Sequence, residues 1–337
     1  MEVACTTYRT RPAFLVTTPG LHFIVMECGA HLASLLHPGA PPASNPLWQP
    51  QWPSGDPASA AALGTWGEGA HAVEAPLLAS IVGSNLCADR FGPSRAGEPA
   101  RPLHGESGVA RFAWVRASPT ACAFEARLPL SGLTVTRTFA VHPDAPTTLR
   151  VQSRLRLPSG GGTAQALEVC EHTTLGGDFL DGVLVTATTG PLAYAMPPAG
   201  SEEAPAALPA EQALRVPAPG DAPEGSVRTL PVAAAAGSGG RASWVATNAR
   251  LGLRLTAAWR AADFPFLCLW TEHCLRAHAP WGGRERARGM EVSSKPFPED
   301  PPASRRQAFL GAPAELTIQP GEEVVREVAL TWEAMAQ

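Results

Sequence analysis

The chain has 337 residues, of which 45% are hydrophobic and 17% charged, and its net charge is -4 with a pI near 6.1. This length can bury a large core, in one large all-β domain or in two ordinary domains. The acidic balance and the lack of a basic stripe argue against a nucleic-acid partner. The one arginine-rich piece, at 284–288, is short, contains an acid, and is interpreted as a loop or a substrate-binding edge.

The beginning of the chain carries an acid, Glu2, and no basic region followed by an apolar stretch, so we expect no signal peptide. No apolar run approaches the ~18 residues that a membrane-spanning helix needs. The seven cysteines are odd in number and form no Cys-x-x-Cys motif, which indicates reduced thiols rather than disulfides. Together these features predict a cytoplasmic protein without a membrane partner.

Short β-forming runs bounded by turn residues recur along the chain. Residues 14–18 and 22–26 flank Pro19-Gly20 and predict a hairpin. Further strands are expected at 110–115, 121–128, 133–141, 147–157, 167–172, 183–188, 244–247, 251–259, 264–270, 289–293 and 323–332.

Apolar and polar residues alternate with period two in 135–141 and 149–155, as in antiparallel sheets with one buried face. Glycine and proline are abundant, at 32 and 35, and long stretches of helical periodicity are missing. We therefore predict an all-β fold: a single domain over 1–337, built as a large antiparallel β-sandwich with few short helices.

Two segments are expected to form long loops. Residues 197–228 are rich in Ala, Pro, Gly and Glu, with one helical turn expected at 209–214. Residues 38–69 carry three tryptophans, Trp48, Trp52 and Trp66. These rings either plug the surface of a sheet, which we favour, or line a ligand site.

Three segments carry residues suited to acid–base chemistry. His172 lies where the strand 167–172 meets a glycine-rich turn, His104 lies on a turn at a sheet edge, and Glu291 lies in a short β run. An imidazole can give or take a proton near neutral pH. Each residue also has a simpler interpretation, since a histidine can bond to its own loop and a glutamate on an alternating strand can point to water.

Taken together, these segments resemble the galactose mutarotase-like superfamily, the aldose 1-epimerases and their relatives. Pro102-Leu103-His104-Gly105 is similar to the Leu-His-Gly turn of that family, and Glu171-His172 is similar to its second histidine. Gly289-Met290-Glu291, with a proline turn after it, is similar to its catalytic glutamate. The early segments 29–35 and 45–48 resemble bacterial relatives of unassigned substrate. The resemblance spans nearly the whole chain and implies the supersandwich fold.

The resemblance implies an aldose 1-epimerase-like enzyme that interconverts the anomers of a sugar. Glu291 would be the base for the anomeric hydroxyl, His172 the acid at the ring oxygen, and His104 a contact to the ring or anomeric oxygen. The chain has Glu-His-Thr-Thr-Leu-Gly-Gly around His172, where galactose mutarotases have Asn-His-x-Tyr-Phe-Asn-Leu, and it offers no clear match for their sugar-binding aspartate. The resemblance therefore does not extend to galactose as the substrate.

Five further residues are candidates for substrate binding, each with an alternative. Arg90 could bind hydroxyls or an anionic group, or pair with Asp89 or Glu98. Trp270 could stack on a sugar or pack in the core, whereas Glu272 and Lys295 could reach the pocket or lie at the surface. Asp181 is one of the acids nearest to the missing aspartate in the sequence.

No cofactor is expected, because the reaction needs neither metal nor nucleotide and the chain has no matching motif. A zinc site built on His104, His172, His273 and Glu291 is disfavoured, because no short-spaced ligand pair supports it. The expected partner is a small carbohydrate, bound by a monomer or homodimer. The alternatives are a non-catalytic carbohydrate-binding or sugar-sensing protein, or another sugar enzyme, such as a lyase, on the same fold.

Overall fold

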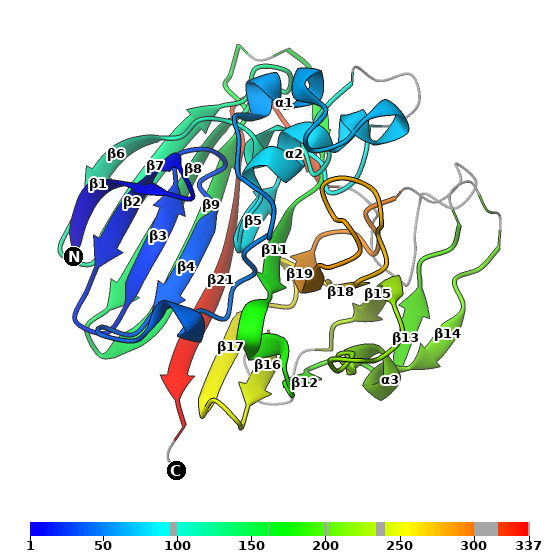
Figure 1. Ribbon diagram of the computed structural model, residues 1–337. Helices are drawn as coiled ribbons and strands as arrows, with labels where there is room; N and C mark the ends of the chain where they lie inside the picture. Colours follow the sequence, from blue (N-terminus) through cyan, green and yellow to red (C-terminus); the bar gives the residue numbers. More distant parts are fainter. Residues whose placement is uncertain are drawn as a thin grey trace.

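The alternating segments form two large antiparallel sheets that pack face to face (Figure 1). The computed structural model describes residues 1–94, 100–160, 162–198, 201, 203–233, 240–299 and 316–335. Every pair of neighbouring strands in these residues is antiparallel, as the period-two patterns predicted. The prediction of an all-β sandwich is confirmed.

The larger sheet has eleven strands and carries the polar side chains discussed below. In spatial order they are β1 (Glu2–Tyr8), β2 (Arg11–Thr17), β3 (His22–Met26), β4 (Leu32–Leu36), β5 (Ser84–Cys87), β11 (Cys170–Leu175), β19 (Arg286–Ser293), β18 (Phe266–His273), β15 (Glu224–Pro231), β13 (Leu192–Ala195) and β14 (Ala207–Pro209). Strands far apart in sequence therefore meet at the centre, where β5, β11, β19 and β18 are neighbours.

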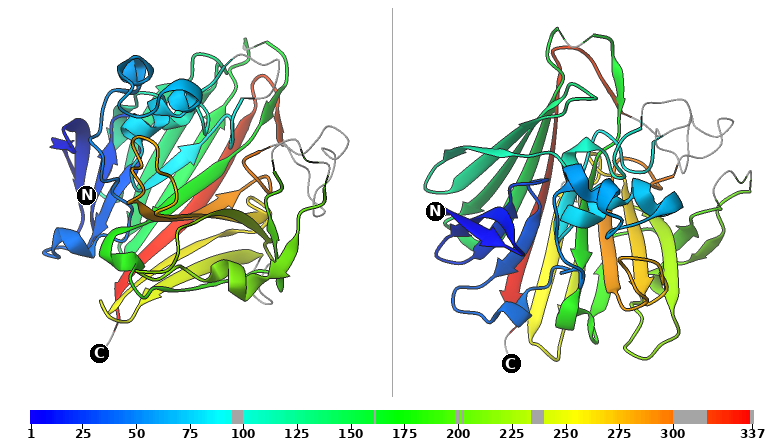
Figure 2. Two further views of the ribbon diagram at one scale, coloured as in Figure 1. Left: turned by 45° about the vertical axis from the view of Figure 1, so that its right-hand side comes forward. Right: turned by 45° about the horizontal axis from the view of Figure 1, so that its top comes forward.

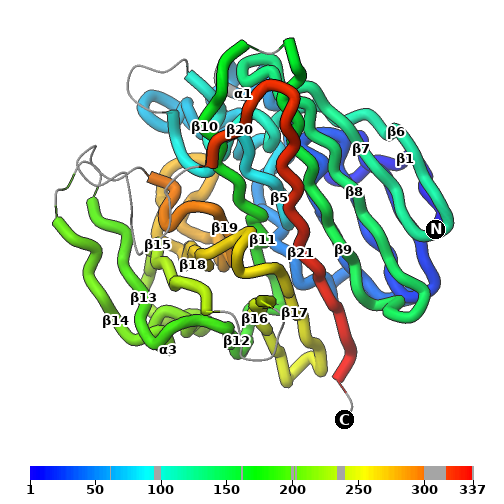
Figure 3. The backbone as a smooth tube through the Cα atoms, turned by 180° about the vertical axis from the view of Figure 1, so that it is seen from behind, coloured from blue at the N-terminus to red at the C-terminus, as the bar shows by residue number. Residues whose placement is uncertain are grey.

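The second sheet has eight strands and is seen from behind in Figure 3. In order they are β12 (Leu184–Ala187), β16 (Arg241–Asn248), β17 (Leu253–Arg260), β21 (Glu323–Ala334), β9 (Ala145–Arg156), β8 (Thr134–His142), β7 (Ala121–Arg127) and β6 (Ala113–Ala117). A separate two-stranded sheet joins β10 (Gln165–Leu167) to β20 (Leu316–Ile318).

Helices are few and short, as expected. They are α1 (Pro57–Leu63), α2 (Ala75–Ser80) and α3 (Ala210–Leu214), with 3₁₀ turns η1 (Pro42–Ser44), η2 (Gly69–Val73), η3 (Glu106–Gly108) and η4 (Gly177–Leu180). In both views of Figure 2, α1 and α2 lie together on one side of the molecule, near the middle of the larger sheet. They cover the face of that sheet that is turned away from the second sheet.

The main hydrophobic core lies between the two sheets. Strand β8 alternates strictly, so that Val135, Arg137, Phe139 and Val141 point inward while Thr134, Thr136, Thr138 and Ala140 are partly exposed. Val135, Phe139 and Val141 belong to one apolar cluster with residues of the facing strands, such as Leu86 and Val292. Burial of this apolar surface supplies the main stabilisation of the sandwich.

The same alternation places one charged residue of β8 in the core. Arg137 has a side chain that is 0% exposed, and its Nη2 lies 2.6 Å from Oε1 of Glu171 on β11, whose side chain is 5% exposed. The guanidinium also lies over the ring of Phe139, 5.6 Å from its centroid. The two sheets are therefore joined by a buried ion pair as well as by apolar packing.

The two segments expected to be loops contain more regular structure than the sequence indicated. Helix α1 falls within 38–69. In 197–228 the helical turn expected at 209–214 is present as α3, but β14 and the beginning of β15 also lie there. These strands form because β13 and β18 provide pairing partners that the local composition does not reveal.

The seven cysteines are all free thiols, as their spacing indicated. Within the described residues, no helix combines the length and the apolar character required to cross a membrane.

Candidate functional site

The candidate site is built on the register of four central strands. His172 of β11 is directly opposite Asn85 of β5 on one side and Glu291 of β19 on the other, and Glu291 is opposite Cys268 of β18. Residues directly opposite one another in antiparallel strands project from the same face. Their side chains therefore project from the face that α2 covers, whereas Glu171 points into the sandwich core.

The central pair is an imidazole in contact with a carboxylate. Nε2 of His172 lies 3.1 Å from Oε1 of Glu291, and both side chains are only 3% exposed. Nδ1 of the same ring lies 3.1 Å from the hydroxyl of Thr174, which fixes the orientation of the imidazole. A proton can therefore pass along this contact or be offered to a ligand atom placed beside it.

His104 reaches the pair from a strained turn. His104 and Gly105 have φ of +63° and +81°, in the left-handed region. A Cβ on Gly105 would lie 2.5 Å from the carbonyl oxygen of Ala88, so only glycine fits there. Nδ1 of His104 contacts the carbonyl oxygen of Phe91 at 2.5 Å, and the ring centroid lies 5.2 Å from that of His172.

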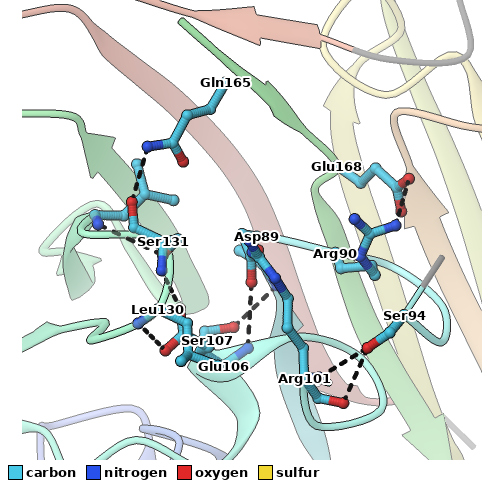
Figure 4. A network of polar contacts seen from close by, with 12 residues as sticks. Asp89, Arg90, Ser94, Arg101, Glu106, Ser107, Leu130, Ser131, Gln165 and Glu168 are labelled. Carbon is cyan, nitrogen blue, oxygen red and sulfur yellow. Dashed lines mark hydrogen bonds and ion pairs between the residues drawn. The ribbon is translucent and has the colours of Figure 1, made fainter. Parts of the chain in front are cut away.

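A polar network holds this turn in place (Figure 4). The buried carboxylate of Glu106 accepts the backbone N–H groups of Leu130 and Ser131, each at 2.7 Å, on the turn between β7 and β8. Asp89 pairs with Arg101 and accepts the backbone N–H of Glu106 at 3.4 Å. The His104 turn is thereby tied to both sheets.

A buried thiol perturbs His104. Burial lowers the pKa of this imidazole, but the negative charge and hydrogen bond of Cys87, with the charge of Glu291, outweigh it and raise the pKa to about 9. Burial raises the pKa of the Cys87 thiol, but hydrogen bonding to Cys170 and the charge of His104 outweigh it and lower the pKa to about 5. Each group therefore favours the charged form of the other.

His104, His172 and Glu291 open into one cavity of about 320 Å³. This volume lies at the lower end of the ~300–1,000 Å³ range typical of small-molecule sites. Its walls are mainly apolar and come from α2, from the segment before His104 and from three indoles. The protein thus places a buried imidazole–carboxylate pair at the floor of a largely apolar pocket.

Arg276 and three tryptophans line this pocket together. The rings of Trp48 and Trp281 are parallel within 10°, with centroids 6.0 Å apart, and Trp270 meets both edge-on. The guanidinium of Arg276 lies 4.6 Å from the centroid of Trp281 and is held by Glu272. Flat apolar faces beside polar groups are suited to the C–H face of a sugar ring.

The predicted substrate-binding residues differ in whether they line the pocket. Trp270 lines the pocket, and its ring lies 6.2 Å from that of His172. Lys295 and Arg90 are buried outside the described pocket lining, with Nζ of Lys295 at 3.1 Å and Nη1 of Arg90 at 3.8 Å from Oε1 of Glu168. Glu98, the alternative partner of Arg90, lies outside the described residues.

Glu272 and Asp181 also make contacts within the protein. Glu272 is buried and accepts the backbone N–H groups of Leu275 and Arg276 at 2.8 and 3.1 Å, which stabilises the turn after β18. Asp181 pairs with Arg286 at 2.7 Å, and it is not among the described residues that line the pocket.

Several pocket residues were not singled out by the sequence. Trp281 and Leu77 line the cavity. Of the three early tryptophans, Trp48 lines the pocket, whereas Trp52 and Trp66 are buried and donate to backbone carbonyls. A tryptophan in a glycine-rich loop, as at Trp281, is the signal that could have identified this wall.

Comparison with known proteins defines the fold. No protein-family model matches the chain, and no curated protein matches its sequence. Solved structures do match: a galactose mutarotase related enzyme from Lactobacillus acidophilus has a TM-score of 0.62 at 10% identity, covering 96% of this chain and 99% of that one. The GalM/aldose epimerase homologue from C. elegans has a TM-score of 0.61 at 12% identity, covering 99% and 100%.

A galactose mutarotase-like protein from Lactobacillus casei is also similar, with a TM-score of 0.57 at 14% identity over 95% of this chain and all of that one. These alignments cover almost the full length of both partners, so the similarity includes both sheets and the connections between them. The chain therefore has the fold of the galactose mutarotase-like superfamily.

Proposed function

We propose that this protein is an aldose 1-epimerase-like isomerase that interconverts the α and β anomers of a sugar. The observation that carries the proposal is the contact of 3.1 Å between His172 and Glu291 at the floor of a pocket sized for a small molecule. Full-length similarity to mutarotase-like structures agrees with it.

Anomer exchange requires two proton transfers, one at each of the two oxygens that are bonded to the anomeric carbon. The anomeric hydroxyl gives up its proton while the ring oxygen gains one, the ring opens to an aldehyde, and closure after rotation about C1–C2 produces the other anomer. Both oxygens are bonded to C1, so an acid and a base within hydrogen-bond distance of each other can serve them together. Glu291 is assigned as the base and His172 as the acid.

His104 is assigned to the oxygen on which negative charge develops. Cys87 and Glu291 raise the pKa of this imidazole to about 9, which favours its cationic form, and the ring bonds to the carbonyl of Phe91 and to Cys87. A cation fixed beside the pocket would stabilise a developing oxyanion through its electric field rather than through a donated hydrogen bond. Trp270 and the other indoles would position the ring, and the alkyl walls would exclude water.

The assignment is tested by anomer exchange measured with saturation-transfer NMR across aldoses, uronic acids and sugar phosphates. Wild type is compared with Glu291→Gln and His172→Asn. Each substitution removes one proton-transfer partner, so we expect exchange on the active sugar to fall by ~10²–10⁴-fold. Thermal melts of each variant check that the fold is intact.

Two substitutions of the same chemistry at a distance from the pocket serve as controls. Glu327→Gln on β21 and His142→Asn at the end of β8 change partly or fully exposed residues and should leave exchange unchanged. If wild type accelerates exchange of no sugar yet shows saturable binding, the protein is instead a carbohydrate-binding or sugar-sensing module. Equal losses of anomer exchange in the control variants and the site variants would contradict the roles assigned to Glu291 and His172.

A further inference from the structure

A second cluster of metal-ligating side chains lies at the rim of the pocket, away from the pair at its floor. His71 belongs to η2, Glu74 follows η2 directly, and His278 lies in the loop between β18 and β19. Each offers one donor atom, and these atoms all lie within 4.8 Å of one another. Among the described residues, no other group of three His, Cys, Asp or Glu side chains is so arranged.

The contacts within the protein leave this cluster unsatisfied. Nε2 of His278 is shielded from solvent and has no hydrogen-bond partner. Nδ1 of His71 and Oε1 of Glu74 are 4.0 Å apart, too far for a hydrogen bond. The two imidazoles stack with centroids 3.7 Å apart and planes within 10°. A buried ring nitrogen without a partner is unfavourable, and a ligand that accepts its lone pair would relieve that cost.

We propose that His71, Glu74 and His278 bind one divalent transition-metal ion of the zinc class. Two imidazoles and a carboxylate are typical donors for Zn²⁺ and its neighbours Co²⁺, Ni²⁺ and Cu²⁺. Three protein donors leave a fourth position for water or for an oxygen atom of a molecule in the pocket.

The geometry defines what binding must change. Zn²⁺ binds imidazole nitrogen at about 2.0–2.1 Å, so donor atoms around a tetrahedral ion lie roughly 3.3 Å apart. The donor atoms, now up to 4.8 Å apart, must therefore approach one another by up to about 1.5 Å. The stacked rings must also tilt, because the ion lies near the plane of each ring it binds. His71 and Glu74 have room for this motion, because their side chains are 45% and 25% exposed.

The ion would join two segments that contribute residues to the pocket lining. Glu74, directly before α2, lines the cavity, and His278 lies in the loop that supplies two other lining residues, Arg276 and Trp281. A shared metal would fix the width of the entrance. This role does not depend on the chemistry at the floor, because none of the three ligands belongs to the acid–base pair.

The experiment uses the full chain without an affinity tag, freed of metal by a chelator and titrated with ZnCl₂ in a calorimeter. We expect one ion per chain with micromolar affinity, a higher melting temperature, and a change in tryptophan fluorescence from Trp281. His71→Gln and His278→Gln should each weaken binding by at least tenfold. CoCl₂ should give the visible absorption of a four-coordinate ion, and neither variant should.

The matched control is His142→Gln, because His142 and Asp144 form an exposed pair at 3.6 Å elsewhere on the surface. It should bind Zn²⁺ as wild type does. Saturation only at millimolar Zn²⁺, or equal binding by His71→Gln and His278→Gln, would overturn the proposal. If either variant unfolds, NMR of the wild type decides: zinc must shift the ring resonances of His71 and His278, and unchanged resonances would also overturn it.

Discussion

The buried ion pair between Arg137 and Glu171 gives a quantitative test of the sandwich. Removing the carboxylate with Glu171→Leu leaves a guanidinium whose side chain is 0% exposed, and whose Nε and Nη1 already lack hydrogen-bond partners. Breaking a buried pair in this way costs about 3–5 kcal/mol. Arg137→Met should cost less, because burial already raises the pKa of Glu171 and the remaining carboxyl can take up a proton.

The double variant Arg137→Met/Glu171→Leu removes both charges and should be close to wild type in stability, since replacing a buried pair by apolar side chains is often neutral. Differential scanning calorimetry measures the effect, and for a chain of this length we expect Glu171→Leu to lower the melting temperature by roughly 4–7 °C. The matched control is the exposed cross-strand pair Arg150–Glu327, at 2.7 Å, whose coupling should stay below about 1 kcal/mol. Equal coupling in the two cycles would refute the argument that burial makes the first pair costly to break.

Two further predictions concern the His104 turn. Cys87→Ser removes the thiolate that favours the imidazolium, so the pKa of His104 should fall from about 9, because burial then acts with less opposition; an NMR titration of the ring measures this, and an unchanged pKa would show that Cys87 is not the cause. Gly105→Ala should lower the melting temperature clearly, because its Cβ would lie 2.5 Å from the carbonyl of Ala88, whereas Gly39→Ala, also at positive φ but with no atom within 4 Å, should cost only about 1–2 kcal/mol. Similar losses in the two alanine variants would contradict the role of close packing at the turn.

The strands predicted most accurately are those with one buried face and one solvent-exposed face. Strand β8 matches its expected range closely because its outward residues, apart from Ala140, are polar and its inward residues, apart from Arg137, are apolar. Strand β5 escaped prediction, because the four residues Ser84–Cys87 are all buried and do not alternate. Strand β15 escaped as well, because its pairing with β18 joins distant parts of the chain. These two strands form because the rest of the fold pairs with them and buries them, not because of a pattern in their own sequence.

The candidate site likewise combines features that the sequence predicts with features that depend on the fold. The residue types and local motifs of His104, His172 and Glu291 were sufficient to select them, because a turn and two strand segments resemble a known family. Their direct register, His172 opposite Glu291, depends on the order of strands in the sheet and cannot be derived from local sequence. Lys295 was selected for its charge and position, but the direction of its side chain follows from Glu168, a partner that lies in a different segment.

Strand β11 connects the stability of the sandwich to its candidate chemistry. Successive side chains of a strand point to opposite faces, so Glu171 faces Arg137 in the core while His172 faces Glu291 in the pocket. Both side chains are polar and buried, so each needs its own partner: Arg137 of the facing sheet for Glu171, and Glu291 of the neighbouring strand for His172. A substitution that keeps the register should therefore affect one face only. Glu171→Leu should lower the melting temperature while leaving anomer exchange per folded molecule close to wild type, and Glu291→Gln should do the reverse. Joint loss in both variants would mean that β11 shifts as a unit, and that the ion pair positions the site as well as holding the sheets together.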